Sequence, residues 1–553
     1  MVGHVFGALQ AAVQRLHRSE SAIFVPELPV LRLHTPLATG ADQLAATAAR
    51  EAGFRVRALL PFAAGDYCKD FAEGSERAEF ERQLAASEAV FALPGERDGG
   101  DDAYVMVGKA IIAAADVLVA VWDGHEEGGP GGTAHVVDIA LRAGVPVIHI
   151  LVDRDGMQIG PVLLLAGGDA FDPVGETLSG DAAYDALLRG ALAPASPEER
   201  EQLAHYLAER ERPSNWRIEY PLLLALLGVR RLTGKPWRQR TVEENVGADS
   251  GSGPAPDVLA YGWANILAVR YAQLFRSGHV TNYALSALAV LLALFGLVAP
   301  AAKPWLVAGE LATIGLLYLN TRAGTRGDWH RRWLQYRYLA ESLRPLSYLK
   351  RTGMAGPPFR DASQPHRLHR ASAADWTRWY AAAVWRQMES PSGAMSHERM
   401  RALAAAALAE QVAPQARYHR VNAHQMHELD HRLHRIGNLL MGTVIVTCLV
   451  FLAGYELFHS WTIANTGLFV LLSAGLPAIG AAVFGLRGHG EHLLAASRST
   501  STVTALEINL ARLERVGRLD DLVEELERTA ANMIDDLNQW TLAYRERSLE
   551  IPG

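Results

Sequence analysis

The chain has 553 residues, a formal net charge of −7 and a hydrophobic content of 49%. This length exceeds what one core normally supports, so two or more domains are expected. The acidic balance argues against a general nucleic-acid binder, because neutralising phosphates requires a basic surface. The two cysteines, Cys68 and Cys448, argue against a disulfide framework or a cysteine zinc site and suit a reducing cytoplasm.

The amino-terminal part alternates apolar runs with helical patterns, beginning without a secretory signal in Met1–Arg18. The alternation predicts an α/β domain over residues 1–160, Rossmann-like, with a doubly wound parallel sheet. Short buried strands are predicted at Val30–Leu33, Arg55–Leu60, Val117–Trp122 and Val145–Val152, and helices at Asp42–Gly53 and Ala134–Gly144. A strand ahead of Val2-Gly3-His4 is expected to be missing or very short.

Two glycine-containing loops follow predicted strands, at the positions where parallel α/β sheets bind ligands. Gly40, Ala41 and Asp42 open one helix, and Gly40 allows close backbone approach to a phosphate at the helix amino terminus. The second loop contains Asp123, Gly124, Gly131, Gly132 and Thr133 before the next helix. Each loop alone is equally well explained by ordinary turn and cap chemistry. The pair together favours a nucleotide-type ligand.

The rest of the chain divides at a composition change. Residues 161–245 are predicted to be a helical extension, and 246–257 a Gly/Pro/Ser-rich linker. Apolar stretches then predict all-α transmembrane hairpins with long cytoplasmic helices: a first module over 258–390, with spans at about 283–299 and 305–320, and a second over 391–553, with spans at about 438–457 and 466–486. The alternative is a soluble bundle with buried apolar helices.

Basic residues set the predicted orientation. Arginines flank the outer ends of both apolar pairs, whereas the two turns contain one lysine, Lys303, and no arginine. The positive-inside rule therefore places the amino-terminal domain and both termini in the cytoplasm. Glu310 lies within a predicted span, where a carboxylate either lines a pore or reaches back to the interface.

Several short motifs in the first 160 residues resemble those of SLOG domains, the Rossmann-like sensors similar to the LOG and DprA-type families and to the sensing domains of TRPM channels. The motifs are Val2-Gly3-His4, Gly40-Ala41-Asp42, Leu60-Pro61-Phe62 with Asp66-Tyr67 and Asp70-Phe71, Ala115–Gly124 and Gly131-Gly132-Thr133. The resemblance implies that Gly3 and His4 join the two glycine loops in binding a nucleotide or nucleotide-derived ligand.

The remainder resembles SLATT modules, two-helix membrane effectors linked to SLOG domains in bacterial conflict. The matching residues are Tyr271-Ala272, Phe275-Arg276-Ser277, Tyr336-Arg337, Ala340-Glu341 and Leu343-Arg344 around the first pair, and Tyr418-His419, Met426, Leu429, Leu433, Gly485-Leu486-Arg487 and Gly490-Glu491 around the second. The resemblance implies a homo-oligomer in the bacterial inner membrane.

Two departures favour a sensor over an enzyme. LOG-type phosphoribohydrolases carry a glutamate where this chain has Val136, and Val5 stands where related sequences have an arginine. A hydrolase using Asp42, His135 or Asp138 is the alternative, and a transporter or structural scaffold is a third reading. Four histidines at helical spacing before the third span, His424, His427, His431 and His434, suit either zinc or a polar cytoplasmic face.

The combined prediction is a ligand-gated membrane effector in anti-phage or conflict defence, with no catalytic residue and no metal. Its partners would be the lipid bilayer, a nucleotide-type small molecule and further copies of itself, and not nucleic acid.

Overall fold

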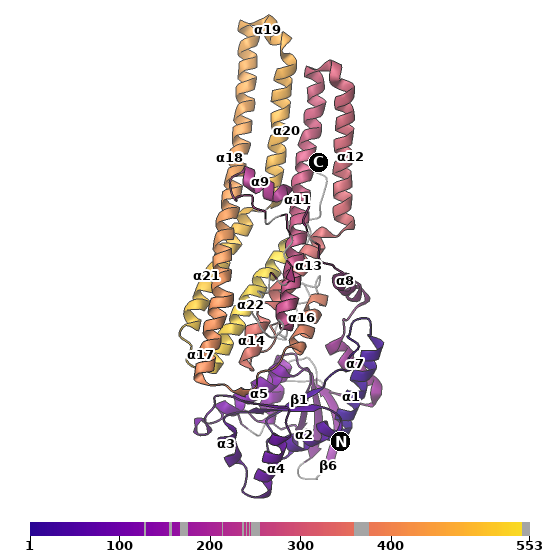
Figure 1. Ribbon diagram of the computed structural model, residues 1–553, viewed down its shortest axis with the longest axis vertical. Helices are drawn as coiled ribbons and strands as arrows, with labels where there is room; N and C mark the ends of the chain where they lie inside the picture. Colours follow the sequence, from indigo (N-terminus) through magenta and orange to yellow (C-terminus); the bar gives the residue numbers. More distant parts are fainter. Residues whose placement is uncertain are drawn as a thin grey trace.

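The protein is described by a computed structural model that covers residues 1–125, 129–153, 158–165, 175–212, 214–234, 237–238, 241–242, 244, 255–358, 375–490 and 492–544. An α/β region forms one end of an elongated molecule, and long helices extend from it to the other end (Figure 1). The predicted division into an α/β amino-terminal part and a helical carboxyl-terminal part is confirmed. Most of the predicted 246–257 linker lies outside the described residues.

The strands form two four-stranded sheets. The first has the order β1-β2-β3-β8 and is parallel throughout, with strands Arg32–Thr35, Arg55–Leu60, Ala89–Ala92 and Gly393–Ala394. The second has the order β4-β5-β6-β7, with strands Leu118–Trp122, Val147–Asp153, Gln158–Leu165 and Gly175–Thr177.

This arrangement differs from the single parallel sheet that the sequence predicts. β4 and β5 are parallel, but β5, β6 and β7 pair antiparallel. Only four residues separate β5 from β6, too few for the helical crossover that a parallel neighbour requires. The predicted boundary at residue 160 therefore falls inside β6.

Nine helices belong to the chain before the long ones. They are α1 (Val2–Ser19), α2 (Ala41–Glu51), α3 (Ala64–Tyr67), α4 (Ser75–Ala85), α5 (Asp102–Ala114), α6 (Thr133–Arg142), α7 (Gly180–Leu192), α8 (Pro197–Leu207) and α9 (Glu219–Leu226), counted among the described residues. Val2, Gly3 and His4 form the first turn of α1, where the sequence suggested the end of a strand. The 161–245 segment is only partly helical, because β6 and β7 extend the second sheet.

The helical part consists of two long pairs and the shorter helices at their base (Figure 1). In chain order they are α11 (Pro256–Val298), α12 (Lys303–Arg326), α13 (Trp329–Leu343), α14 (Leu346–Thr352), α16 (Asp375–Gln387), α17 (His397–Ala406), α18 (Ala413–Leu457), α19 (His459–Ala464), α20 (Thr466–Gly490), α21 (His492–Leu513) and α22 (Leu519–Tyr544). α11 packs along α12, and α18 packs along α20.

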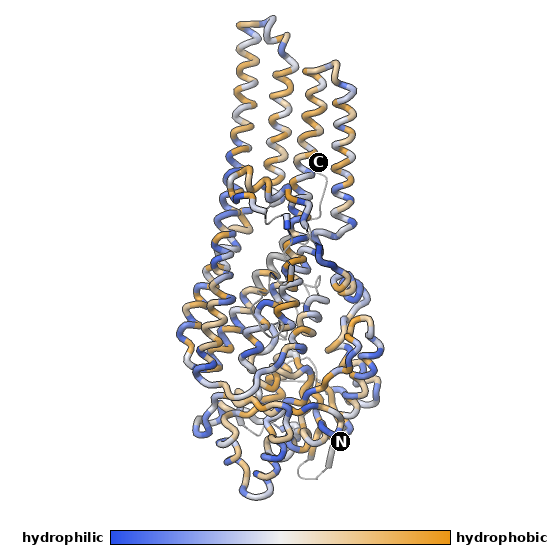
Figure 2. Tube along the Cα trace, in the orientation of Figure 1, coloured by the Kyte–Doolittle hydropathy of each residue, from blue (hydrophilic) through white to orange (hydrophobic). Residues whose placement is uncertain are grey.

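Among the described residues, three helical stretches are long and apolar enough to cross a membrane, and they lie within Pro256–Val298, His397–Leu457 and Thr466–Leu513. Only 11–17% of the residues in their most apolar windows are buried, so a soluble core does not cover them. Figure 2 shows the apolar stretches gathered at the end of the molecule opposite the α/β region. These features indicate a membrane protein. The sequence also predicts a span in α12, but this helix is less apolar than the other three because it contains Lys303, Glu310 and Asn320.

One hydrophobic core runs from the first sheet into the bases of the long helices. Phe91 of β3, Leu267 of α11, Trp376 of α16 and Leu526 of α22 belong to a single buried cluster. The parallel pairing of β8 with β3 adds backbone hydrogen bonds to this contact, and Met395 N–H donates to the Ala92 carbonyl at 2.9 Å. The α/β region and the helical base are therefore packed as one body.

Candidate ligand site and its connection to the long helices

The first glycine loop leads from β1 into α2. Gly40 precedes the helix with a φ of 95°, which favours glycine. The Asp42 carboxylate accepts the backbone N–H of Ala38 at 3.2 Å and so closes the loop on itself. Burial raises the pKa of Asp42 to about 6. The carboxylate thus has a structural partner and an environment that disfavours its charge.

The second loop leads from β4 to α6, and it too contains glycines in the left-handed region. Gly124 (φ 84°) directly follows Asp123, whose carboxylate accepts the His125 N–H at 3.2 Å. Gly131 (φ 83°) lies against α5, where an added Cβ would be 2.7 Å from the Tyr104 Cβ. Gly132 caps α6 and Thr133 begins it. Gly128 lies outside the described residues.

An aromatic cluster lies between the two loops. Burial raises the pKa of the Tyr67 hydroxyl and the nearby Asp42 carboxylate raises it further, and the Tyr67 ring contacts Phe62 at 5.6 Å between centroids. Phe62 in turn contacts Tyr104 at 6.1 Å, and Tyr104 packs against Gly131. The structure therefore connects Gly40–Asp42 to Gly131–Thr133 through these rings, at the ends of the strands where a ligand was predicted.

Sequence reasoning missed two polar residues of this cluster. The Tyr104 hydroxyl donates to one Asp70 oxygen at 2.7 Å, and the Arg97 guanidinium donates to the other at 2.6 Å. Neither residue stands in a recognisable motif. Tyr104 lies on the first turn of α5. The sequence signal that could have located it is a glycine-containing loop that leads into the start of a helix.

Gly3 and His4 lie apart from the two loops. The nearest side-chain atom to an added Cβ at Gly3 is the Ala48 Cβ, at 4.0 Å. Ala48 is seven residues along α2 from Ala41, which corresponds to about 10 Å. His4 is exposed on the first turn of α1. The structure thus places both residues nearer the far end of α2.

The three residues of the hydrolase alternative are each engaged by their own helix or loop. Asp42 accepts from Ala38, the His135 Nδ1 accepts the Gly131 N–H at 3.0 Å, and Asp138 pairs with Arg142 at 3.0 Å. Val136 packs against α5, within 2.9 Å of a Cβ added at Gly108. No hydrogen bond joins any two of the three within the described part of the chain, so they form no acid–base pair there.

The histidine stripe lies on α18, with His424, His427 and His431 exposed. Arg435 contacts His431 at 2.9 Å, and His434 contacts Arg487 and Asn438, each at 3.2 Å. Across the described residues, no group of three or more histidine, cysteine or acidic side chains has the arrangement of a metal site. Glu310 is half-buried on α12.

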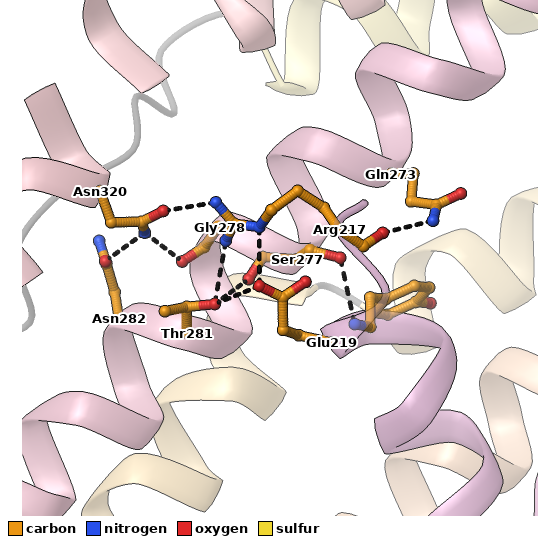
Figure 3. A network of polar contacts seen from close by, with 9 residues as sticks. Arg217, Glu219, Gln273, Ser277, Gly278, Thr281, Asn282 and Asn320 are labelled. Atoms are coloured by element: carbon orange, nitrogen blue, oxygen red, sulfur yellow. Dashed lines mark hydrogen bonds and ion pairs between the residues drawn. The ribbon is translucent and has the colours of Figure 1, made fainter. Parts of the chain in front are cut away.

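A buried polar network at the base of the first helical pair was not predicted at all (Figure 3). Arg217, only 4% exposed, donates to the Asn320 side-chain oxygen at 2.7 Å and to the Thr281 hydroxyl at 2.9 Å, and pairs with Glu219 at 2.7 Å. Asn320 then donates to the Gly278 carbonyl at 3.0 Å and to Asn282 at 2.7 Å. One arginine between α8 and α9 thus holds α11 and α12 together.

No family model, no curated protein and no solved structure matches this chain. The fold and these sites define its class: a parallel-sheet α/β region packed as one body with helices long and apolar enough to span a membrane.

The Asp42 environment predicts a pH-dependent stability. Because the folded pKa exceeds the unfolded value of about 4, the folded state binds the proton more tightly, and the contribution to stability is lost as pH rises through about 6. Asp42→Asn is expected to increase the free energy of unfolding near neutral pH by up to about 3 kcal/mol, seen as a higher melting temperature, and to have little effect near pH 4. Asp138→Asn, on the surface of α6, is the control. A neutral-pH melting temperature below wild type in Asp42→Asn would contradict the assignment.

Proposed function

We propose that the chain is a ligand-gated effector of the bacterial inner membrane, in which a nucleotide-type molecule bound beside Gly40–Asp42 and Gly131–Thr133 controls the packing of the long helices. The observation that carries the proposal is the shared core between the first sheet and the helical base. A ligand that shifts the loops at the strand ends would shift the helix bases with them. Gating requires a differential affinity of a few kcal/mol between two states.

In this proposal both helical pairs cross the bilayer as hairpins, with the α/β region and the termini in the cytoplasm. α12 is the least apolar of the four proposed spans. Its 24 residues correspond to about 36 Å, enough for a hydrocarbon core of about 30 Å. Its exposed Trp305, Leu311 and Leu319 side chains suit a lipid-facing surface. Oligomerised hairpins would then open a pore or disrupt the membrane, in the setting of defence against phage.

Two features favour a sensor over a hydrolase. The Asp42, His135 and Asp138 side chains are each occupied by local contacts. Val136 stands where a hydrolase of the resembling family would need a carboxylate, and it packs against α5 instead.

Two experiments test the proposal. First, the full chain should remain in the membrane pellet after alkaline carbonate extraction and require detergent for release; recovery in the supernatant as a monodisperse protein would refute it. Second, the chain in dye-loaded liposomes should release dye when NAD, ADP-ribose or a nucleoside monophosphate is added. Gly132→Asp is expected to abolish the response, and Gly190→Asp, at an exposed position of α7, to preserve it. Turnover of the added compound that is lost in Asp138→Ala would favour the hydrolase instead.

A further inference from the structure

A cavity lies between the bases of the two helical pairs, away from the sheet. Its volume is about 520 Å³, within the range of small-molecule sites, and its walls come from α9, α11, α13, α18, α21 and α22. The cavity therefore contacts both modules at once. The sequence-predicted site at the strand ends shares none of its lining residues.

The lining is strongly basic in a chain whose net charge is negative. Seven arginines contribute to it, Arg230, Arg231, Arg238, Arg270, Arg276, Arg337 and Arg498, against one carboxylate, Glu341. That carboxylate is already neutralised, because it pairs with Arg337 at 2.6 Å and with Arg344 at 3.0 Å. Arg238 also has an acidic partner outside the cavity, Glu244. The lining as a whole is cationic, which favours an anion over a cation as the ligand.

Arg276 is the best-positioned of these cations. Its guanidinium lies 5.1 Å from the centre of the Trp333 ring and 5.4 Å from that of Tyr220. Contact with two rings fixes the plane of the group and leaves the N–H donors on its edge for hydrogen bonding. Within the described residues no carboxylate lies at ion-pairing distance from it. A fixed guanidinium of this kind suits the oxygen atoms of a phosphate.

Apolar side chains form part of the cavity wall and indicate that the ligand has an apolar portion. Leu224 of α9, Ile266 of α11 and Met426 of α18 contribute to the walls beside the arginines. Arg276 also lies seven residues before Tyr283, where the first predicted span begins, or about 10 Å along α11. Basic pockets between helices at this depth suit phosphate headgroups.

We propose that this cavity binds a phosphate-bearing anion with an apolar portion, and that the bound anion bridges the two helical pairs. The phosphate contacts Arg276 and Arg498, and the apolar portion lies against α9. Two sources have this chemistry, the headgroup of an anionic phospholipid and a soluble nucleotide. Because α11 contributes one wall and α18 and α21 another, occupancy of the cavity restrains how the first pair moves relative to the second.

The test uses the full chain in phosphatidylcholine nanodiscs. ADP is added in one arm, and phosphatidylglycerol replaces part of the lipid in the other, with the apparent melting temperature as the readout. Either ADP or phosphatidylglycerol should raise the apparent melting temperature of the wild-type protein. In Arg276→Gln/Arg498→Gln the apparent affinity for that probe should fall by about tenfold or more. The control Arg417→Gln/Arg515→Gln removes two exposed arginines that do not line the cavity and should behave as wild type.

Further variants keep the outcome interpretable. Arg276→Lys/Arg498→Lys retains the charges and should recover part of the affinity, which separates loss of binding from loss of folding. Gly132→Asp, placed at the strand ends, should leave the cavity response intact, so failure here is distinct from failure of the gating proposal. The inference is overturned if neither probe stabilises wild type, or if the glutamine pair responds as wild type does.

Discussion

Replacing Arg217 with methionine is expected to destabilise the protein by about 3 kcal/mol or more. The buried guanidinium pairs with Glu219 and donates hydrogen bonds to Thr281 and Asn320. The substitution removes the ion pair and both hydrogen bonds. Removing one member of a buried pair costs more than the pair contributes, because the remaining polar groups stay desolvated. The apparent melting temperature in detergent reports the loss, and protease cleavage between α8 and α9 should become faster.

Two companion variants define the cause of the Arg217 effect. Arg210→Met removes an exposed arginine from the same segment and should change stability by about 0.5 kcal/mol or less. Arg217→Lys keeps the charge but not the planar fork of donors, and should lie between wild type and methionine. Equal stabilities for Arg217→Met and Arg210→Met would show that the network does not hold the helix bases.

Gly353→Ala is expected to cost about 2–4 kcal/mol through two separate effects. Gly353 has a φ of 71°, which side-chain-bearing residues rarely adopt. An added Cβ would also lie 2.5 Å from the Phe91 Cε1 atom of β3 and 2.9 Å from the Pro391 Cγ atom. The substitution therefore separates the end of α14 from the sheet, and thermal unfolding in detergent measures the loss.

The same turn supplies the control for Gly353. Gly356 has no positive φ, and an added Cβ there would meet nothing within 4 Å. Gly356→Ala should therefore differ from wild type by about 0.5 kcal/mol at most. If Gly353→Ala were as stable as Gly356→Ala, the contact between helical base and sheet would be looser than the geometry indicates. Ligand-induced dye release from liposomes should fall in Gly353→Ala if this contact transmits the signal.

The sequence predicted the elements whose signal is local. The apolar run at Arg55–Leu60 is β2 with the same bounds, and Asp42–Gly53 differs from α2 by a residue or two at each end. β3, Ala89–Ala92, was not predicted. β8 has only two residues, and its pairing with β3 depends on a contact from far along the chain.

For α11, the sequence predicted only the apolar half of the helix. α11 begins at Pro256, well before the predicted span at about 283, because its first half is polar on one side and buries the other against neighbouring helices of the base, chiefly α13. Arg217 and the arginines that line the cavity between the helical pairs could not be predicted from hydropathy. They come from segments far apart in sequence, and only the packed helices bring their side chains together.

The pairing of β8 with β3 also constrains the order in which the chain can fold during synthesis. About 300 residues separate Ala92 from Gly393, and the first helical pair lies among them. At typical translation rates the ribosome needs roughly 15–60 seconds to make this stretch. The edge of β3 thus stays uncovered while α11 and α12 leave the ribosome, and the nascent chain depends on its carboxyl-terminal half to finish its first sheet.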